Sequence, residues 1–238
     1  MTTAAVLHAV VVGTLLVVSL TGCDIVPARA KAGKPRDTAP TQAAAFHALY
    51  DQQCAGCHGR DGRLGAARPL NDPVYLALVP AERVRHVIAE GVPGTAQPAF
   101  AIGAGGALTD EQIEALVQGL QSVWSRPDAL RGESVPPYAA ALGDPERGRA
   151  VYAAACASCH GPDGGGGTKA RSVVEPSYLA LVSDQHLRTT VIAGRADLGM
   201  PDWRGQIAGR ALSPAEVSDV VAWLVTKRMP VPGRPGGS

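Results

Sequence analysis

Apolar residues occupy positions i, i+3, i+4 and i+7 in two segments of the chain, the spacing that places side chains on one face of an α-helix. These residues are Ile113, Leu116, Val117 and Leu120 in the first segment and Val217, Val220, Val221 and Leu224 in the second. Thr109 with Gln112 precedes the first segment, which is typical of a helix capping box, and Ser213 with Glu216 precedes the second. No stretch alternates convincingly between apolar and polar residues as a half-buried strand would, so the pattern predicts an all-α fold.

Both segments belong to a longer internal repeat. Its corresponding stretches are 50–58 and 152–160, 73–79 and 176–182, and 108–113 and 212–217, with the single residues Gly91 and Gly194, Pro98 and Pro201, and Phe100 and Trp203 in between. Only single-residue shifts in loops are needed to align them. One unit used twice indicates two tandem domains, since a solenoid needs at least three short repeats.

Composition and helix-start signals divide the chain. The 28 Gly and 19 Pro exclude a coiled coil, and Asp144 followed by Pro145 is typical of the first residues of a helix. The parts that we predict are a signal peptide (1–22), a tether (23–40), a first domain (41–124), a Pro-containing linker (125–143), a second domain (144–229) and a flexible tail (230–238).

Charge excludes one class of partner. The chain has 22 Lys and Arg against 21 Asp and Glu, a net charge of +1. Binding to nucleic-acid phosphates needs a basic excess on one face, so we expect no nucleic-acid partner. The hydrophobic core of a domain of this size gives only marginal stability, and such domains often need a covalent cross-link or a bound metal as a staple.

Four of the five cysteines indicate what that staple is. They form two Cys-x-x-Cys-His motifs, Cys54-x-x-Cys57-His58 and Cys156-x-x-Cys159-His160. Two thiols one helical turn apart can form thioethers with the two vinyl groups on one porphyrin edge, and the next residue turns its imidazole toward the iron. A redox disulfide or half a zinc site is the alternative for a single pair. Twice in matched contexts, the motif predicts two covalently bound haem c groups.

The fifth cysteine, Cys23, follows an apolar run at 9–20 that is too short to span a membrane and is typical of a signal-peptide core. Leu20-Thr21-Gly22-Cys23 resembles the bacterial lipobox, which implies lipidation of Cys23. Because residues 1–22 contain no Lys or Arg, a plain secretory signal or an uncleaved anchor is the alternative. Export agrees with c-type haem attachment, which implies the periplasmic side of the cell membrane.

With these motifs and the C-terminal helix, each unit resembles a small class I bacterial cytochrome c over about 41–124 and 144–229. The resemblance implies His58 and His160 as axial ligands and a methionine ligand from a later loop. In the second unit Met200 has Pro201 after it and Trp203 three residues on, as in the family. A His/Met pair would give that haem a high reduction potential.

The first unit departs from the family at this loop. Gln97 stands where Met200 stands, at the same distance from the preceding aligned glycine. We therefore expect the first haem to lack a methionine, with Gln97, water or His86 as its sixth ligand. A carboxamide oxygen suits ferric iron better than ferrous iron, so we expect the first haem to have a lower reduction potential than the second. The iron of the first haem could also be open to small exogenous ligands.

The resemblance also implies residues around each haem. A carbonyl near Pro69 would accept the second N–H of the His58 imidazole, and Phe100 and Trp203 would pack beside the porphyrins. In the second unit no Pro stands at that point, so either a different carbonyl serves His160 or the hydrogen bond of its imidazole is looser. Four arginines could pair with haem propionates, although a solvated surface position is favoured for any one of them; they are Arg60, Arg68, Arg171 and Arg204.

These features favour electron transfer over catalysis as the function. We expect a lipid-tethered dihaem carrier that takes electrons from a quinol-oxidising complex or a periplasmic dehydrogenase and passes them to a terminal oxidase or similar acceptor. A fixed cytochrome subunit of a larger respiratory or photosynthetic complex is a close variant. The alternatives are a peroxidase-like dihaem oxidoreductase with an open first haem and, without any recognisable output domain, a haem-based gas sensor.

Overall fold

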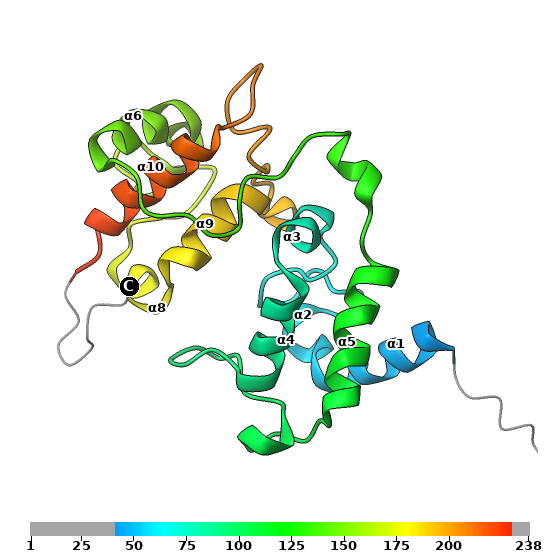
Figure 1. The fold of residues 1–238 in the computed structure, drawn as a ribbon. Helices are drawn as coiled ribbons and strands as arrows, with labels where there is room; N and C mark the ends of the chain where they lie inside the picture. The colour runs from blue at the N-terminus through cyan, green and yellow to red at the C-terminus, as the bar shows by residue number, and fades with distance from the viewer. Residues whose placement is uncertain (1–40, 230–238) are drawn as a thin grey trace, which may run out of the picture. The chain divides into compact units, whose positions relative to one another are not determined.

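The computed structural model describes residues 41–229. Within this range every regular element is a helix, and the residues form isolated bridges but no strand (Figure 1). The all-α fold expected from the sequence is therefore confirmed. The predicted signal peptide, Cys23 with its tether at 23–40, and the tail at 230–238 lie outside the described residues.

The helices follow the repeat in the sequence. The first half of the described chain contains α1 (Gln42–Gln53), α2 (Ala55–His58), α3 (Pro73–Leu78), α4 (Ala81–Glu90), the short 3₁₀ helix η1 (Ile102–Ala104) and α5 (Asp110–Val123). A second 3₁₀ helix, η2 (Pro127–Leu130), lies in the linker. The second half contains α6 (Pro145–Ala155), α7 (Ala157–His160), α8 (Pro176–Leu181), α9 (Asp184–Ala193), the 3₁₀ helix η3 (Ala196–Leu198) and α10 (Pro214–Thr226).

In the first domain the N-terminal helix α1 packs against the C-terminal helix α5. A Cβ atom at Gly119 would lie 2.1 Å from Cδ2 of Phe46, so only glycine lets the two helices approach this closely. Phe46 and Tyr50 are fully buried, and their rings meet Trp124 at centroid distances of 5.1 and 4.7 Å in edge-on geometry. The crossing fixes the end of α1, from which the first cysteine motif continues.

The second domain repeats this crossing with α6 and α10. Here the close approach is at Gly148, where a Cβ atom would lie 1.9 Å from the carbonyl oxygen of Asp219. Tyr152 stacks on Trp223 with ring centroids 4.2 Å apart. The glycine that permits the close approach is on the C-terminal helix in the first domain and on the N-terminal helix in the second. The two domains therefore form the same helix crossing with the glycine on opposite helices.

Both C-terminal helices begin at the predicted capping boxes. Thr109 accepts from the Gln112 N–H while the Gln112 side chain accepts from the Thr109 N–H, and Ser213 and Glu216 do the same. Asp144 caps α6 through the N–H of Arg147. These three helix starts, predicted from the sequence, are confirmed.

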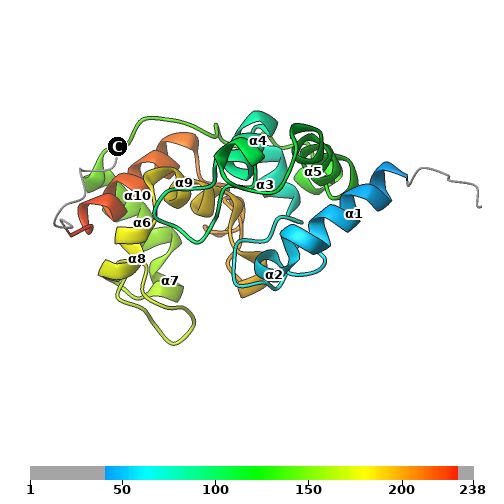
Figure 2. The ribbon, with the colours of Figure 1, turned by 90° about the horizontal axis from the view of Figure 1, so that it is seen from below.

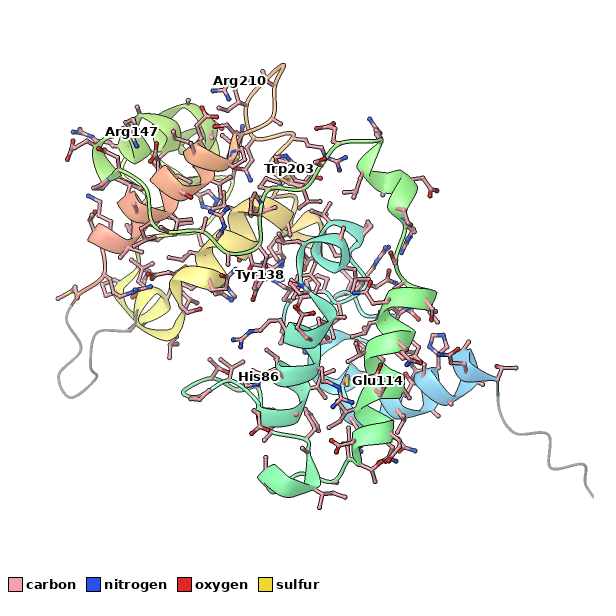
Figure 3. All side chains as sticks on the ribbon, viewed as in Figure 1. His86, Glu114, Tyr138, Arg147, Trp203 and Arg210 are labelled. Carbon is pink, nitrogen blue, oxygen red and sulfur yellow. The ribbon has the colours of Figure 1, made fainter. Side chains whose placement is uncertain are left out.

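Two contacts join the halves of the described chain. Helix α3 packs against α9, as Figures 1 and 2 show from two directions. The linker, in which Figure 3 labels Tyr138, also docks on α9. The buried Arg188 of α9 donates from Nη2 to the carbonyl of Pro137 at 2.8 Å and from Nε to that of Tyr138 at 3.1 Å. Arg188 Nη1 donates to Ser218 on α10 at 3.0 Å, so one side chain fastens the linker to two helices.

Within residues 41–229 no helix combines the length and the apolar character that a membrane crossing requires.

Candidate functional site

Each Cys-x-x-Cys-His motif lies at the break between two helices. Cys54 ends α1, where its N–H donates to the Tyr50 carbonyl at 2.8 Å, and the remaining residues of the motif form α2. The Tyr50 hydroxyl donates to the carbonyl of Gly59, just past the motif, at 2.9 Å. This tyrosine therefore ties both sides of the motif together.

The second motif has the same frame. Cys156 ends α6 with its N–H bonded to the Tyr152 carbonyl at 2.8 Å, and the Tyr152 hydroxyl donates to the carbonyl of Gly161 at 2.7 Å. The sequence signal for this role was the tyrosine at the same position in both repeats, although its hydrogen bond was not anticipated.

The surroundings of the first cysteine of each motif disfavour redox exchange. Cys54, Cys57, Cys156 and Cys159 are all free thiols. Burial, followed by the charge of the neighbouring cysteine, raises the pKa of Cys54 and of Cys156 to about 11. A thiol with a raised pKa is a poor nucleophile for disulfide exchange, which disfavours the redox-disulfide alternative.

Zinc is disfavoured by the surroundings of the motifs. In the part of the chain that the structure describes, no group of three or more His, Cys, Asp or Glu side chains is arranged to hold a metal ion. A structural zinc site needs four such ligands around the metal.

Each motif histidine is held by one backbone carbonyl. His58 Nδ1 lies 2.7 Å from the carbonyl oxygen of Arg68, and His160 Nδ1 lies 2.8 Å from that of Arg171. Since a carbonyl can only accept, Nδ1 carries the proton and Nε2 is left with its lone pair for a metal. In the first domain the acceptor is the residue before the expected Pro69; in the second, Arg171 does the same without a following proline.

Gln97 and Met200 share one backbone hydrogen bond, in which their carbonyl accepts from the residue after the loop glycine. Val92 N–H donates to the Gln97 carbonyl at 3.0 Å, and Arg195 N–H donates to the Met200 carbonyl at 3.0 Å. Each loop follows a glycine with positive φ, Gly91 at 70° or Gly194 at 68°. A Cβ atom on Gly91 would lie 2.7 Å from the Gln97 carbonyl oxygen, and one on Gly194 would lie 2.7 Å from that of Met200.

The side chains of these loops differ in chemistry. Gln97 is half-buried, and its Nε2 lies 3.4 Å from the carbonyl oxygen of the next residue, Pro98, which is a long hydrogen bond. Met200 is also half-buried but offers a thioether, a soft ligand suited to ferrous iron. The two domains thus offer different potential iron ligands, an amide and a thioether, at equivalent positions of the repeat.

The predicted aromatic residues occupy equivalent places. Phe100 N–H donates to the Ile88 carbonyl at 3.0 Å and Trp203 N–H to the Ile192 carbonyl at 2.9 Å, which joins each loop to the helix before it. Trp203 is 2% exposed and Phe100 is half-buried. The Arg204 guanidinium lies over the Trp203 ring, 4.9 Å from its centroid (Figure 3).

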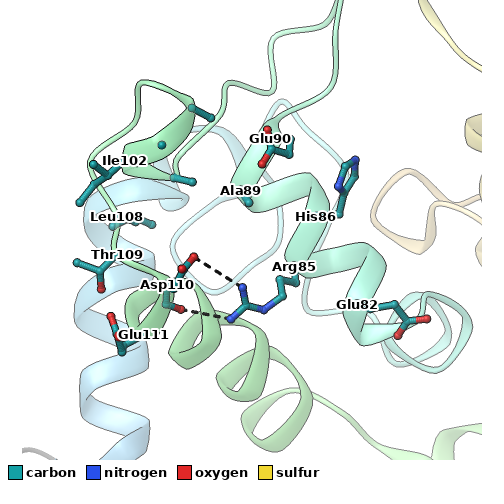
Figure 4. A pocket seen from close by; sticks show the side chains of 13 residues that line it. Glu82, Arg85, His86, Ala89, Glu90, Ile102, Leu108, Thr109, Asp110 and Glu111 are labelled. Atoms are coloured by element: carbon teal, nitrogen blue, oxygen red, sulfur yellow. Dashed lines mark hydrogen bonds and ion pairs between the residues drawn. The ribbon is translucent and has the colours of Figure 1, made fainter.

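His86, the other candidate ligand of the first haem, is exposed on α4. It lines a surface hollow together with Glu82, Arg85 and Glu90, and Figure 4 shows Arg85 turned toward Asp110 with His86 pointing elsewhere. The residues that line this hollow do not include Gln97. The structure thus brings Gln97, and not His86, into the loop position that Met200 holds.

The four arginines have different surroundings. Arg60 and Arg171 are exposed, as expected for solvated side chains, and Arg204 pairs with Asp202 at 2.7 Å. Arg68 departs from the expectation, because it is half-buried and its guanidinium reaches α9. Nothing in the sequence distinguished Arg68 from Arg171 in this respect.

These observations fit covalently attached haem. Both motifs offer two thiols one turn apart and an imidazole with Nε2 available, and the second domain also contains the half-buried thioether of Met200. Haem attachment would use Cys54, Cys57, Cys156 and Cys159, and the iron would bind His58 and His160.

Comparison with known proteins agrees. The family model for cytochrome C oxidase, cbb3-type, subunit III matches residues 41–118 and 143–224. The cbb3-type cytochrome c oxidase subunit CcoP of Azospirillum sp. (strain B510) is 29% identical over 188 residues, which are 71% of this chain and 58% of the relative. The chain therefore spans less than two thirds of that relative's length.

Solved structures are more distant. The reducing HAO-like protein complex of Kuenenia stuttgartiensis is 18% identical with a TM-score of 0.47 and covers 78% of this chain and 96% of its own. Reduced cytochrome c4 from Pseudomonas stutzeri is 18% identical with a TM-score of 0.25 and covers 77% and 97%. Neither likeness supports an inference.

The family model covers more than half of the chain and matches it twice, once over each cysteine motif. The chain is an electron-transfer cytochrome c with two tandem domains and two covalently bound haem c groups, and it belongs to the family of cytochrome c oxidase, cbb3-type, subunit III.

Proposed function

We propose that the chain is a membrane-tethered dihaem electron-transfer protein that passes electrons to a terminal oxidase on the periplasmic side of the membrane. The observation that carries the proposal is the pair of equivalent loops, in which Met200 and Gln97 have the same backbone hydrogen bond. One haem then has two strong protein ligands and the other has one.

The residues of the second domain are arranged to carry electrons and not to bind substrate. The haem iron, when bound, accepts and returns one electron. His160, oriented by the Arg171 carbonyl, and Met200 would occupy both axial positions and leave no site for an exogenous ligand. The buried Trp203 excludes water beside this loop.

The first domain differs only at the distal loop. His58 would be the proximal ligand, oriented by the Arg68 carbonyl in the way that the Arg171 carbonyl orients His160. A carboxamide oxygen from Gln97, or water, would stabilise ferrous iron less than a thioether does, so this haem would have the lower potential. Electrons would then enter at the first haem and leave from the second.

The proposed acceptor follows from the relative in Azospirillum, a subunit of a cbb3-type oxidase. Membership of the same family supports an oxidase of this kind as the acceptor, with a quinol-oxidising complex or a periplasmic dehydrogenase as the donor. It equally favours a second candidate, in which the chain is a fixed subunit of such a complex. The near-neutral charge suits a tethered protein, whose encounters depend little on long-range steering.

The test uses the purified holoprotein, with two haems verified by mass. We expect two midpoint potentials in a spectroelectrochemical titration, oxidation of the reduced protein by membranes that contain a cbb3-type oxidase, and no peroxide turnover. Rapid peroxide reduction with cyanide binding at the first haem would instead establish the peroxidase-like alternative. Co-purification with oxidase subunits in a fixed ratio from detergent-solubilised membranes would identify a fixed subunit.

A further inference from the structure

Arg68 contacts both halves of the described chain through different atoms. Its carbonyl oxygen accepts from His58 Nδ1 at 2.7 Å. Its guanidinium extends to α9, where Nη2 donates to Thr190 Oγ1 at 2.6 Å and Nη1 to the carbonyl of Gly194 at 3.4 Å. Gly194 begins the loop that carries Met200, so one residue joins the proximal side of the first site to the distal side of the second.

The guanidinium carries a positive charge that no carboxylate in residues 41–229 neutralises through an ion pair. Its contacts are a hydroxyl, a carbonyl and the ring of Tyr75, whose centroid lies 5.5 Å from Cζ. The neighbouring Arg195 is paired with Asp197 through two hydrogen bonds of 2.9 and 2.8 Å. Arg68 is thus a half-buried cation that has no ion-pair partner in residues 41–229, and partial removal from water strengthens the field of such a charge.

Arg171 provides an internal comparison. Its carbonyl holds His160 as that of Arg68 holds His58, but its side chain is exposed and forms no hydrogen bond or ion pair with residues 41–229. There is no reverse contact within residues 41–229, because α8 does not pack against α4 as α3 packs against α9. The two arginines share the backbone role and differ only in the side chain.

We propose that Arg68 is a positioning residue that couples the two haem sites, holding His58 through its carbonyl and fixing the base of the Met200 loop through its guanidinium. A fixed positive charge beside the second site favours the less positive, ferrous state and raises the potential of that haem. The inference rests on the haem ligands proposed above but not on the donor or the acceptor.

The test compares Arg68→Gln with Arg171→Gln, since both keep the backbone carbonyl and remove one positive charge. The midpoint potentials of both haems are measured on the isolated holoprotein, and the second haem is identified by the shift that Met200→Gln causes. We expect Arg68→Gln to lower the second haem's midpoint, Arg171→Gln to change it much less, and Arg68→Lys to restore most of it. An equal effect of the two glutamine variants, or a lysine variant that behaves like glutamine, would overturn the proposal.

Thr190→Val provides a second readout if Arg68→Gln does not fold, because valine is the first domain's own residue at this position. We expect faster amide hydrogen exchange over residues 190–200 and a smaller downward shift of the second haem's midpoint. Unchanged exchange together with an unchanged midpoint would also overturn the proposal. Either result leaves electron transfer to an oxidase untouched, since no partner takes part in these measurements.

Discussion

Gln97 and Met200 have the same backbone partner, a donated N–H from the residue after the loop glycine, at 3.0 Å in each case. The half-buried side chains at this position are an amide and a thioether. Because thioether sulfur suits ferrous iron and amide oxygen does not, the identity of this single residue would separate the potentials of two haems that otherwise share a proximal geometry.

The residue exchange Gln97→Met should raise the lower midpoint potential, because the loop already has the backbone that presents a methionine. Axial ligands set haem potentials over a span of about 0.8 V, and we expect a shift on the order of 0.1 V. Spectroelectrochemical titration measures it, and Met200→Gln is the reciprocal control that should lower the higher midpoint. No shift of either midpoint in Gln97→Met would show that residue 97 is not near the iron.

Much of the site could be predicted from residues whose chemistry is local. The cysteine motifs, the capping boxes and the alignment of Gln97 with Met200 depend on short spacings that a single sequence displays. The carbonyl of Arg171 could not be predicted, because any residue type can supply a carbonyl and no proline marked the place. The burial of Arg68 depends on α9, more than a hundred residues away, and Arg171 has the same local role with an exposed side chain.

At the scale of the elements, the crossing of N- and C-terminal helices supports each cysteine motif. In the second domain Asp219, 4% exposed on α10, accepts from the Asp144 N–H at 2.7 Å and from Arg147 Nε at 2.9 Å. The contact ties the start of α6 to the middle of α10. Gly148 lies one turn further on, and its lack of a side chain permits the close packing. The crossing is therefore stabilised by the hydrogen bonds of Asp219 and by the close approach at Gly148.

The variant Gly148→Ala should separate α6 from α10, because the new Cβ would meet the Asp219 carbonyl oxygen, a backbone atom that cannot rotate away. Overpacking of this kind costs about 1–3 kcal/mol, and we expect the upper part of that range. Urea unfolding of the holoprotein measures the loss. Gly165→Ala is the control, since nothing lies within 4 Å of a Cβ there, and equal stability of the two variants would contradict the role of the crossing.

The capping boxes predict a difference in acid stability between the domains. The hydrogen bond from Arg210, followed by bonds from Ser213, lowers the pKa of Glu216 to about 2 from its ordinary value of 4.5. The depressed pKa stabilises the folded state above pH 4.5, and this contribution is lost as the pH falls from 4.5 toward 2. Gln112 fills the same position in the first domain and does not titrate.

We therefore expect Glu216→Gln to reduce the loss of stability on acidification. The measurement is the urea midpoint of the wild type and the variant at pH 6 and pH 3. Gln112→Glu is the converse control, which should make the first domain more sensitive to acid. Parallel acid dependence in the wild type and Glu216→Gln would show that the capping carboxylate does not contribute.

At the scale of the whole molecule, two sites of unequal chemistry are joined by few contacts. Helix α3 meets α9, Arg68 crosses between them, and Arg188 fastens the linker to α9 and α10. A fixed separation of two redox groups favours rapid transfer between them, because no encounter has to be repeated for each electron. Under the proposed function, the junction would contribute to electron transfer as well as connect the domains.

Attachment to the membrane is the last property of the whole molecule that a single exchange can test. Cys23→Ser should release the protein into the soluble periplasmic fraction, because the lipobox-like Leu20-Thr21-Gly22-Cys23 would lose the thiol that carries the lipid. Fractionation with haem staining measures the release, and mass spectrometry of the wild type should find an acylated N-terminus at residue 23. Haem content should be unchanged, since Cys23 is outside both haem motifs. Membrane retention of the variant after high-salt washing would exclude the lipid as the sole attachment and favour an uncleaved anchor or a fixed place in an oxidase complex.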